Sequence, residues 1–223
     1  MDIDFFGNGL STYCHTAKNE LWEFGQFHEE TEASWKKKDE ELQSHIDGVL
    51  KKHPEKRHDD IIDNYSWDLH QNQYKYPNIH RESLIITIYN FLEAQLNDLC
   101  AIMEECVPST IKLKDLSGLG IERAFLYLNK VAVFDFSAMG RELPYIKGVN
   151  QVRNQIVHNA ARLPEAENHK VNKFISQAKN LSGSPGSQIS VSSGFIIEFI
   201  GVLSDFFEKL DTEVQRYIQS TNA

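Results

Sequence analysis

The chain has 223 residues, of which 41% are hydrophobic and 25% charged, and a formal net charge of −9. This length and composition can build a full core, either in one large domain or in one domain with an extension. The negative charge argues against a protein that coats nucleic acid non-specifically, because such binding depends on Lys and Arg. No apolar run approaches the roughly 20 residues that cross a bilayer.

The first 75 residues predict a helical extension. From Leu21 to about Lys52 the chain is charged and free of proline, and a helical spacing joins Trp35, Leu42, Ile46, Val49 and Leu50. His53-Pro54 ends this helix. The segment from Glu55 to Asn78 predicts a short amphipathic piece and then a polar loop that ends at Pro77.

The strongest helix is expected over residues 80–106. Ile85, Leu92 and Leu99 recur every seven residues and form part of a wide apolar stripe. Asn90, Glu93 and Asn97 form a separate polar line on the same helix. This line is either a helix face exposed to solvent, or Glu93 or Asn97 lines a cleft.

Three further helices are expected, at residues 121–131, 148–161 and 194–219. The last has a clear apolar stripe of Ile196, Ile200, Leu203, Phe207, Leu210, Val214 and Tyr217. A Ser/Gly/Pro-rich connection precedes it at 181–193, with a small hairpin at 188–191 as one option. Together these elements predict an all-α fold, with an extension at residues 1–75 and an antiparallel helical bundle at 76–223 that a long helix closes.

Arginine and histidine lie five residues apart in the helix expected at 148–161, at Arg153 and His158. A guanidinium can hold a phosphate through two hydrogen bonds, and an imidazole can move a proton near neutral pH. The two are about 140° apart on an ideal helix. Because Arg is long and Pro164 ends the helix soon afterwards, we expect them to converge at the helix end. Asn154 shares the His158 face.

Motifs of other chemistries are absent. No HExxH, paired CxxC or EF-hand loop occurs, and the densest histidine group, His53 and His58 beside two aspartates, is interpreted as a surface cluster. We therefore expect neither a metal nor another cofactor. Cys14, Cys100 and Cys106 are an odd set without ligand spacing, and the chain starts without an apolar leader, so free thiols and a cytoplasmic location are expected.

The order of these helices, together with R-N-x-x-x-H-N at Arg153 to Asn159, resembles the HEPN superfamily. The resemblance covers roughly residues 80–220 and does not explain the first 75. It implies an antiparallel helical bundle that forms a homodimer, with two R-N-x-x-x-H motifs in one cleft. The helix around Glu93 is similar to the long first helix of that fold, where an acidic or polar residue often faces the motif.

Many HEPN proteins are metal-independent endoribonucleases of toxin–antitoxin or anti-phage defence systems. The resemblance thus implies an RNA substrate, tRNA among the options, and an antitoxin or defence-system partner, with no membrane. Arg153, His158 and Asn154 would be catalytic, and Glu93, Asn97 and Asn159 would bind substrate or support the site. The departure after Asn159, which reads Ala160-Ala161-Arg162, leaves a second hypothesis: a catalytically inactive HEPN-type module that binds a nucleotide or a protein.

Overall fold

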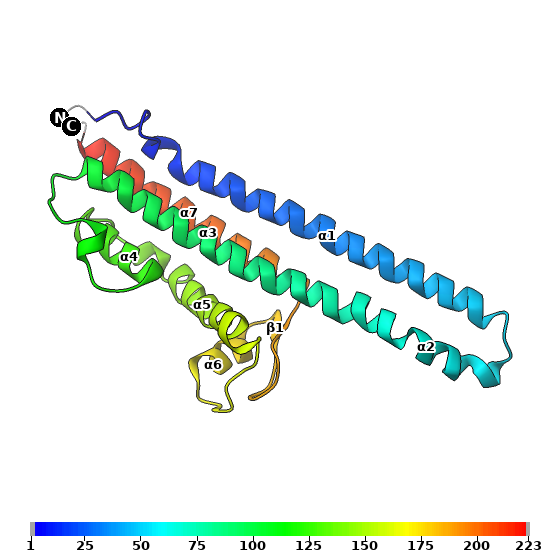
Figure 1. Cartoon of the computed structure of the whole chain (residues 1–223). Helices are drawn as coiled ribbons and strands as arrows, with labels where there is room; N and C mark the ends of the chain where they lie inside the picture. Colours follow the sequence, from blue (N-terminus) through cyan, green and yellow to red (C-terminus); the bar gives the residue numbers. More distant parts are fainter. Residues whose placement is uncertain (1–2, 222–223) are drawn as a thin grey trace.

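The computed structural model describes residues 3–221 and shows an all-α bundle (Figure 1). Three long helices build its frame: α1 (Tyr13–Leu50), α3 (Tyr76–Cys106) and α7 (Ser193–Thr221). Shorter helices α4 (Gly120–Lys130), α5 (Glu142–Asn159) and α6 (Lys170–Gln177) lie on one side of this frame. The all-α fold and the long closing helix are therefore confirmed.

The core is a continuous apolar cluster between α1, α3, α4, α5 and α7. The apolar stripes of α3 and α7 explain it, because residues three or four apart share one helix face. The buried residues of the two stripes include Ile85, Tyr89, Leu92, Leu96, Leu99, Met103, Ile196, Leu203, Phe207, Leu210 and Val214. Among the described residues, no helix is long and apolar enough to cross a bilayer.

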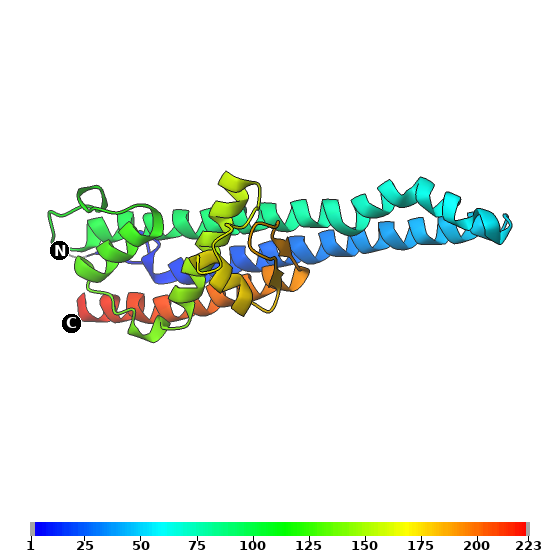
Figure 2. The same cartoon turned by 90° about the horizontal axis from the view of Figure 1, so that it is seen from below.

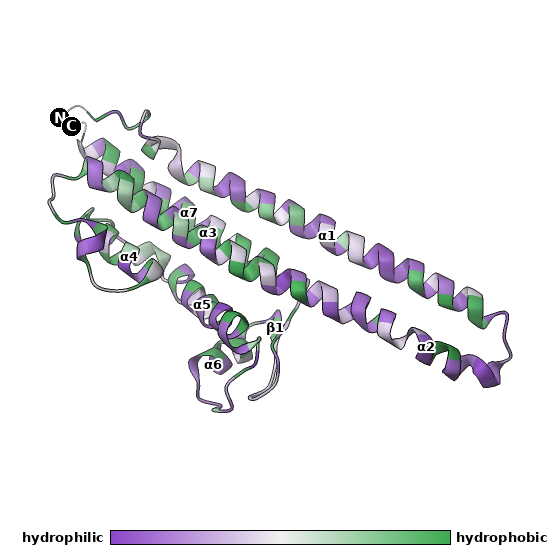
Figure 3. Ribbon diagram, in the orientation of Figure 1, coloured by the Kyte–Doolittle hydropathy of each residue, from purple (hydrophilic) through white to green (hydrophobic). Residues whose placement is uncertain are grey.

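The N-terminal residues contribute to the core as well as to an arm. The first half of α1 packs along α7 and buries Cys14, Ala17 and Leu21. The second half pairs with α2 (His58–His70), and the two project beyond the rest of the bundle in both views (Figures 1 and 2). We call residues 33–75 the arm; Figure 3 shows that its helix α2 is mainly hydrophilic.

The prediction of a polar loop that ends at Pro77 is wrong, because this segment is helical. A π-helical turn (Gln71–Lys75) joins α2 directly to α3, which begins at Tyr76. Pro77 follows this turn within a continuous helical run; proline lacks the N–H of the regular i→i−4 bond, and the π-helical turn interrupts that bonding pattern just before it. A proline after polar residues therefore lies inside a helical run here, not at the end of a loop.

Two smaller elements complete the chain. The short helix α6 was not expected; it packs on α5 and buries Val171 and Ile175. A two-stranded antiparallel sheet pairs β1 (Leu181–Ser182) with β2 (Ser190–Val191), so a hairpin does form, although it begins earlier than residue 188. The hairpin leads directly into α7.

Gly148 allows α5 and α6 to approach closely. A Cβ at this position would lie 2.2 Å from Cδ2 of Phe174. We expect Gly148→Ala to lower the free energy of unfolding by about 1–2 kcal/mol, because overpacking costs more than the helix propensity that alanine gains. Urea unfolding measures the change.

Gly201 on α7 is the matched control, because nothing lies within 4 Å of an added Cβ there. Gly201→Ala should stabilise by up to about 1 kcal/mol. Equal effects of the two substitutions would contradict the close α5–α6 contact.

Candidate functional site

Helix α5 carries the R-N-x-x-x-H motif. Its buried stripe includes Ile146, Val149 and Val152, which hold it against the core, and it begins earlier than predicted, at Glu142. The helix ends because Ala160 and Ala161 both adopt the left-handed conformation, with φ of 49° and 59°. The motif therefore occupies the last two turns of a well-anchored helix.

Arg153 is held by two amide side chains. Its Nη1 donates to Asn154 Oδ1 and its Nη2 to Asn90 Oδ1 of α3, both at 3.2 Å, and its Cζ lies 6.0 Å from the ring centroid of Tyr89. Within residues 3–221 no carboxylate pairs with Arg153. The guanidinium thus has a fixed position and an uncompensated positive charge.

His158 lies in the exposed last turn of α5. Among the described residues no hydrogen bond joins the His158 side chain to Arg153 or to any other group. The regular helix keeps the side chains of Arg153 and His158 on different faces through residue 159. Asn159 donates a hydrogen bond to Oε1 of the buried Gln155. Val157, which precedes His158, is 44% exposed.

Glu93 and Asn97 lie on α3, one and two turns from Asn90. The Glu93 carboxylate packs against Gly120, where a Cβ would be 3.3 Å from Oε1. Asn97 has a buried Oδ1 without a hydrogen-bond partner. Of the polar line on α3, it is therefore Asn90, rather than Glu93 or Asn97, that bonds to the motif.

The charges of Glu93 and Arg153 both act on the phenol of Tyr89. Burial is the main reason that the pKa of Tyr89 is raised; the negative charge of Glu93 adds to it and the positive charge of Arg153 opposes it. The phenol therefore stays protonated beneath the guanidinium. Asn90 and Tyr89 were not among the predicted site residues, although Asn90 belongs to the polar line that the sequence shows.

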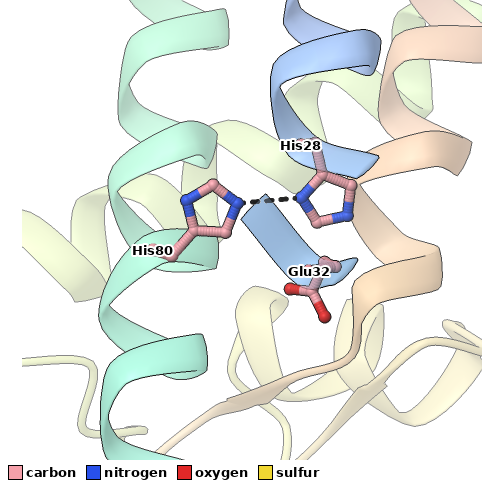
Figure 4. Close-up of side chains that lie close together, drawn as sticks. All are labelled: His28, Glu32 and His80. Carbon is pink, nitrogen blue, oxygen red and sulfur yellow. Dashed lines mark hydrogen bonds between the residues drawn. The ribbon is translucent and has the colours of Figure 1, made fainter. Parts of the chain in front are cut away.

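A second polar cluster lies at the base of the arm and has no counterpart in the sequence predictions. It joins His28 and Glu32 of α1 to His80 of α3 (Figure 4). The ring nitrogens His28 Nδ1 and His80 Nε2 are 3.1 Å apart, and Arg81 donates to both oxygens of Glu32. His28 is completely buried.

Burial dominates the electrostatics of this cluster. It lowers the pKa of His28 and of His80, so both imidazoles stay neutral at neutral pH. Burial also acts to raise the pKa of Glu32, but the hydrogen bonds and charge of Arg81 outweigh it and the net shift is downward. Only the i, i+4 spacing of His28 and Glu32 could have pointed to this cluster, because His80 is far away in the sequence.

Comparison of the chain with protein-family models, with curated proteins and with solved structures finds no match.

Proposed function

We propose that the protein is a metal-independent endoribonuclease of the HEPN type. The observation that carries this proposal is the Arg153 guanidinium, which two amides hold in place and no described carboxylate neutralises. A guanidinium has five N–H donors; two are used here and the Nε–H is buried, so one N–H on Nη1 and one on Nη2 remain for a phosphate. His158, exposed at the end of the same helix, supplies an imidazole that can accept or donate a proton.

The proposed reaction is attack of a ribose 2′-hydroxyl on the adjacent phosphorus. His158 removes the proton of the hydroxyl, and the P–O5′ bond breaks as the leaving oxygen takes up a proton. Arg153 holds the phosphate and offsets the charge that develops in the transition state. The products are a 2′,3′-cyclic phosphate and a 5′-hydroxyl, and Asn154 keeps Arg153 in place.

A homodimer completes this scheme. Since one histidine cannot easily act as base and acid at once, a second copy related by a two-fold axis would set its own His158 opposite the first, so that one acts as base and the other as acid. The half-exposed Val157 next to His158 offers an apolar contact for such a partner. We place this enzyme in the cytoplasm, as a toxin or anti-phage effector acting on RNA such as tRNA, under control of an antitoxin or defence-system partner.

The second candidate is a catalytically inactive HEPN-type module that binds a nucleotide or a protein. The net charge of −9 favours it, because a polyanionic substrate is repelled at long range by an acidic protein.

Incubation of total RNA and tRNA with purified protein in EDTA separates the two. We expect cleavage with 2′,3′-cyclic phosphate ends, its loss in His158→Ala, and its retention in His45→Ala, which changes an exposed histidine of the arm. RNA left intact by folded, dimeric parent protein would favour the binding module. Cleavage that survives in His158→Ala would reject the assigned base.

A further inference from the structure

We propose that His28, Glu32 and His80 form a binding site for a divalent first-row transition metal, with Zn²⁺ the best fit. Each residue offers one donor atom, and the three atoms lie within 4.8 Å of one another (Figure 4). Two imidazoles and a carboxylate are a common ligand set for zinc, with a water in the fourth position. The site goes beyond the proposed ribonuclease, whose motif lies on another helix.

The two imidazoles are already at ligand spacing. Nitrogens bound to one tetrahedral zinc ion at about 2.0–2.1 Å lie roughly 3.3 Å from each other, and His28 Nδ1 and His80 Nε2 are 3.1 Å apart. The rings are nearly parallel, with 9° between their planes. To admit the ion in place of the direct hydrogen bond, the two rings would turn so that both nitrogen lone pairs point at the metal, with little change in the distance between the nitrogens.

The surrounding groups orient these ligands as outer-shell partners do in metal proteins. His28 Nε2 lies 3.1 Å from the carbonyl oxygen of Ser193, at the start of α7. Donation from Nε2 to this carbonyl leaves the lone pair on Nδ1, which faces His80. The metal-facing nitrogen of His28 is therefore set by the backbone of a third helix.

Arg81 fixes the carboxylate. It donates to Glu32 Oε1 at 2.8 Å and to Oε2 at 2.6 Å, and its Nη1 donates to the carbonyl oxygen of Val191 at 3.0 Å. Each carboxylate oxygen keeps a further lone pair for an ion. The charge of Arg81 opposes the cation, so the neutral imidazoles must supply much of the affinity.

The surface is hollowed beside His80. His80 lines an open hollow of about 830 Å³ between α1 and α3, which also contains Phe27 and the carboxylates of Glu20 and Glu23. Carboxylates along such a hollow raise the local concentration of cations. An ion bound by His28, Glu32 and His80 would link α1 to α3, and to the start of α7 through the contact of His28 with Ser193, at the base of the arm.

The test uses the full chain, stripped with a chelator and then titrated with Zn²⁺ alone against a chromophoric competitor. We expect the parent to bind one more equivalent than His80→Gln and Glu32→Gln, and its Tm to rise by several degrees at a hundredfold excess of Zn²⁺ over Kd. Co²⁺ should give the absorption of a four-coordinate site. His15→Ala, an exposed histidine of the same helix, should match the parent.

Glutamine at residue 80 can still donate to His28, so the fold should survive, and circular dichroism without metal checks that it does. Equal zinc stoichiometry in the parent and in folded His80→Gln would overturn the proposal and leave the pair as a buried hydrogen bond. These readouts are independent of RNA cleavage, which is expected to persist in EDTA.

Discussion

Arg153→Lys should reduce RNA cleavage almost as much as Arg153→Ala, by about 10²–10³-fold in the rate of the chemical step. Lysine keeps the positive charge but has a single ammonium, whereas Arg153 uses Nη1 for Asn154 and Nη2 for Asn90 and still has donors for a phosphate. Single-turnover cleavage at saturating enzyme measures this step directly. A lysine variant with near-parental rate would mean that charge alone, not the bound geometry, supports the reaction.

Arg162→Lys is the matched control. Arg162 is an exposed arginine close in sequence that donates to the carbonyl oxygen of Gly186 in the following loop. It has no part in the proposed site, and its replacement should leave the cleavage rate unchanged.

Asn90→Asp tests the role of Arg153 as phosphate holder without removing the arginine. The aspartate has the shape of asparagine but would form an ion pair with Arg153, so the guanidinium would lose the charge that it offers to a phosphate. We expect cleavage to fall at least tenfold while the protein stays folded, with a Tm no lower than that of the parent. Full activity in this variant would contradict the role of Arg153 as phosphate holder.

The long helices could be predicted because their apolar residues repeat with the helical period over many turns. α3 and α7 show this best, since nearly all residues of their predicted stripes are buried. Elements that depend on context could not be predicted: α6 has only eight residues, and Pro77 reads as a loop unless the preceding π-helical turn is known. The boundary at residue 75 stays a prediction.

In the candidate site, too, residues with a local spacing could be predicted, and residues that meet through helix packing could not. Arg153, Asn154 and His158 are recognisable from local spacing, and the structure places all three on one helix. The partner of Arg153 is Asn90, 63 residues earlier, because packing of α3 against α5 selects one member of a polar line. The cluster of His28, Glu32 and His80 depends on two helices meeting, so the spacing within one helix reveals only two of its members.

Lys209→Met should destabilise the protein by about 3 kcal/mol at pH 7. The Glu142 side chain is only 2% exposed, and Lys209 Nζ donates to both of its carboxylate oxygens at 2.8 Å. This pair joins the first turn of α5 to α7 and so helps to hold the helix that carries Arg153 and His158. Removing the lysine leaves a buried carboxylate without its partner, whereas the lysine itself, 37% exposed, could be solvated alone.

Lys18→Met is the control for the loss of a lysine. Lys18 pairs with Glu208, whose side chain is 71% exposed, and a surface pair of this kind contributes little to stability. Urea unfolding of both variants should therefore give clearly different midpoints. Similar losses would show that the Glu142–Lys209 pair behaves as a surface pair.

The pH dependence of Lys209→Met should have the opposite sign to that of the parent. In the parent, burial acts to raise the pKa of Glu142, but the hydrogen bonds from Lys209 and the nearby positive charges outweigh it, so the net pKa lies below 4.5. The stabilisation by this carboxylate is thus present above pH 4.5 and is lost as the pH falls below that value. Without Lys209, a backbone hydrogen bond and the charge of Arg141 still act to lower the pKa of Glu142, but burial is the largest influence and we expect it to raise the pKa above its unfolded value. A group with a raised carboxyl pKa binds its proton more tightly in the folded state, so the deficit of the variant should shrink as the pH falls from 7 to 5. A deficit that is constant over this range would show that water reaches Glu142 once Lys209 is gone.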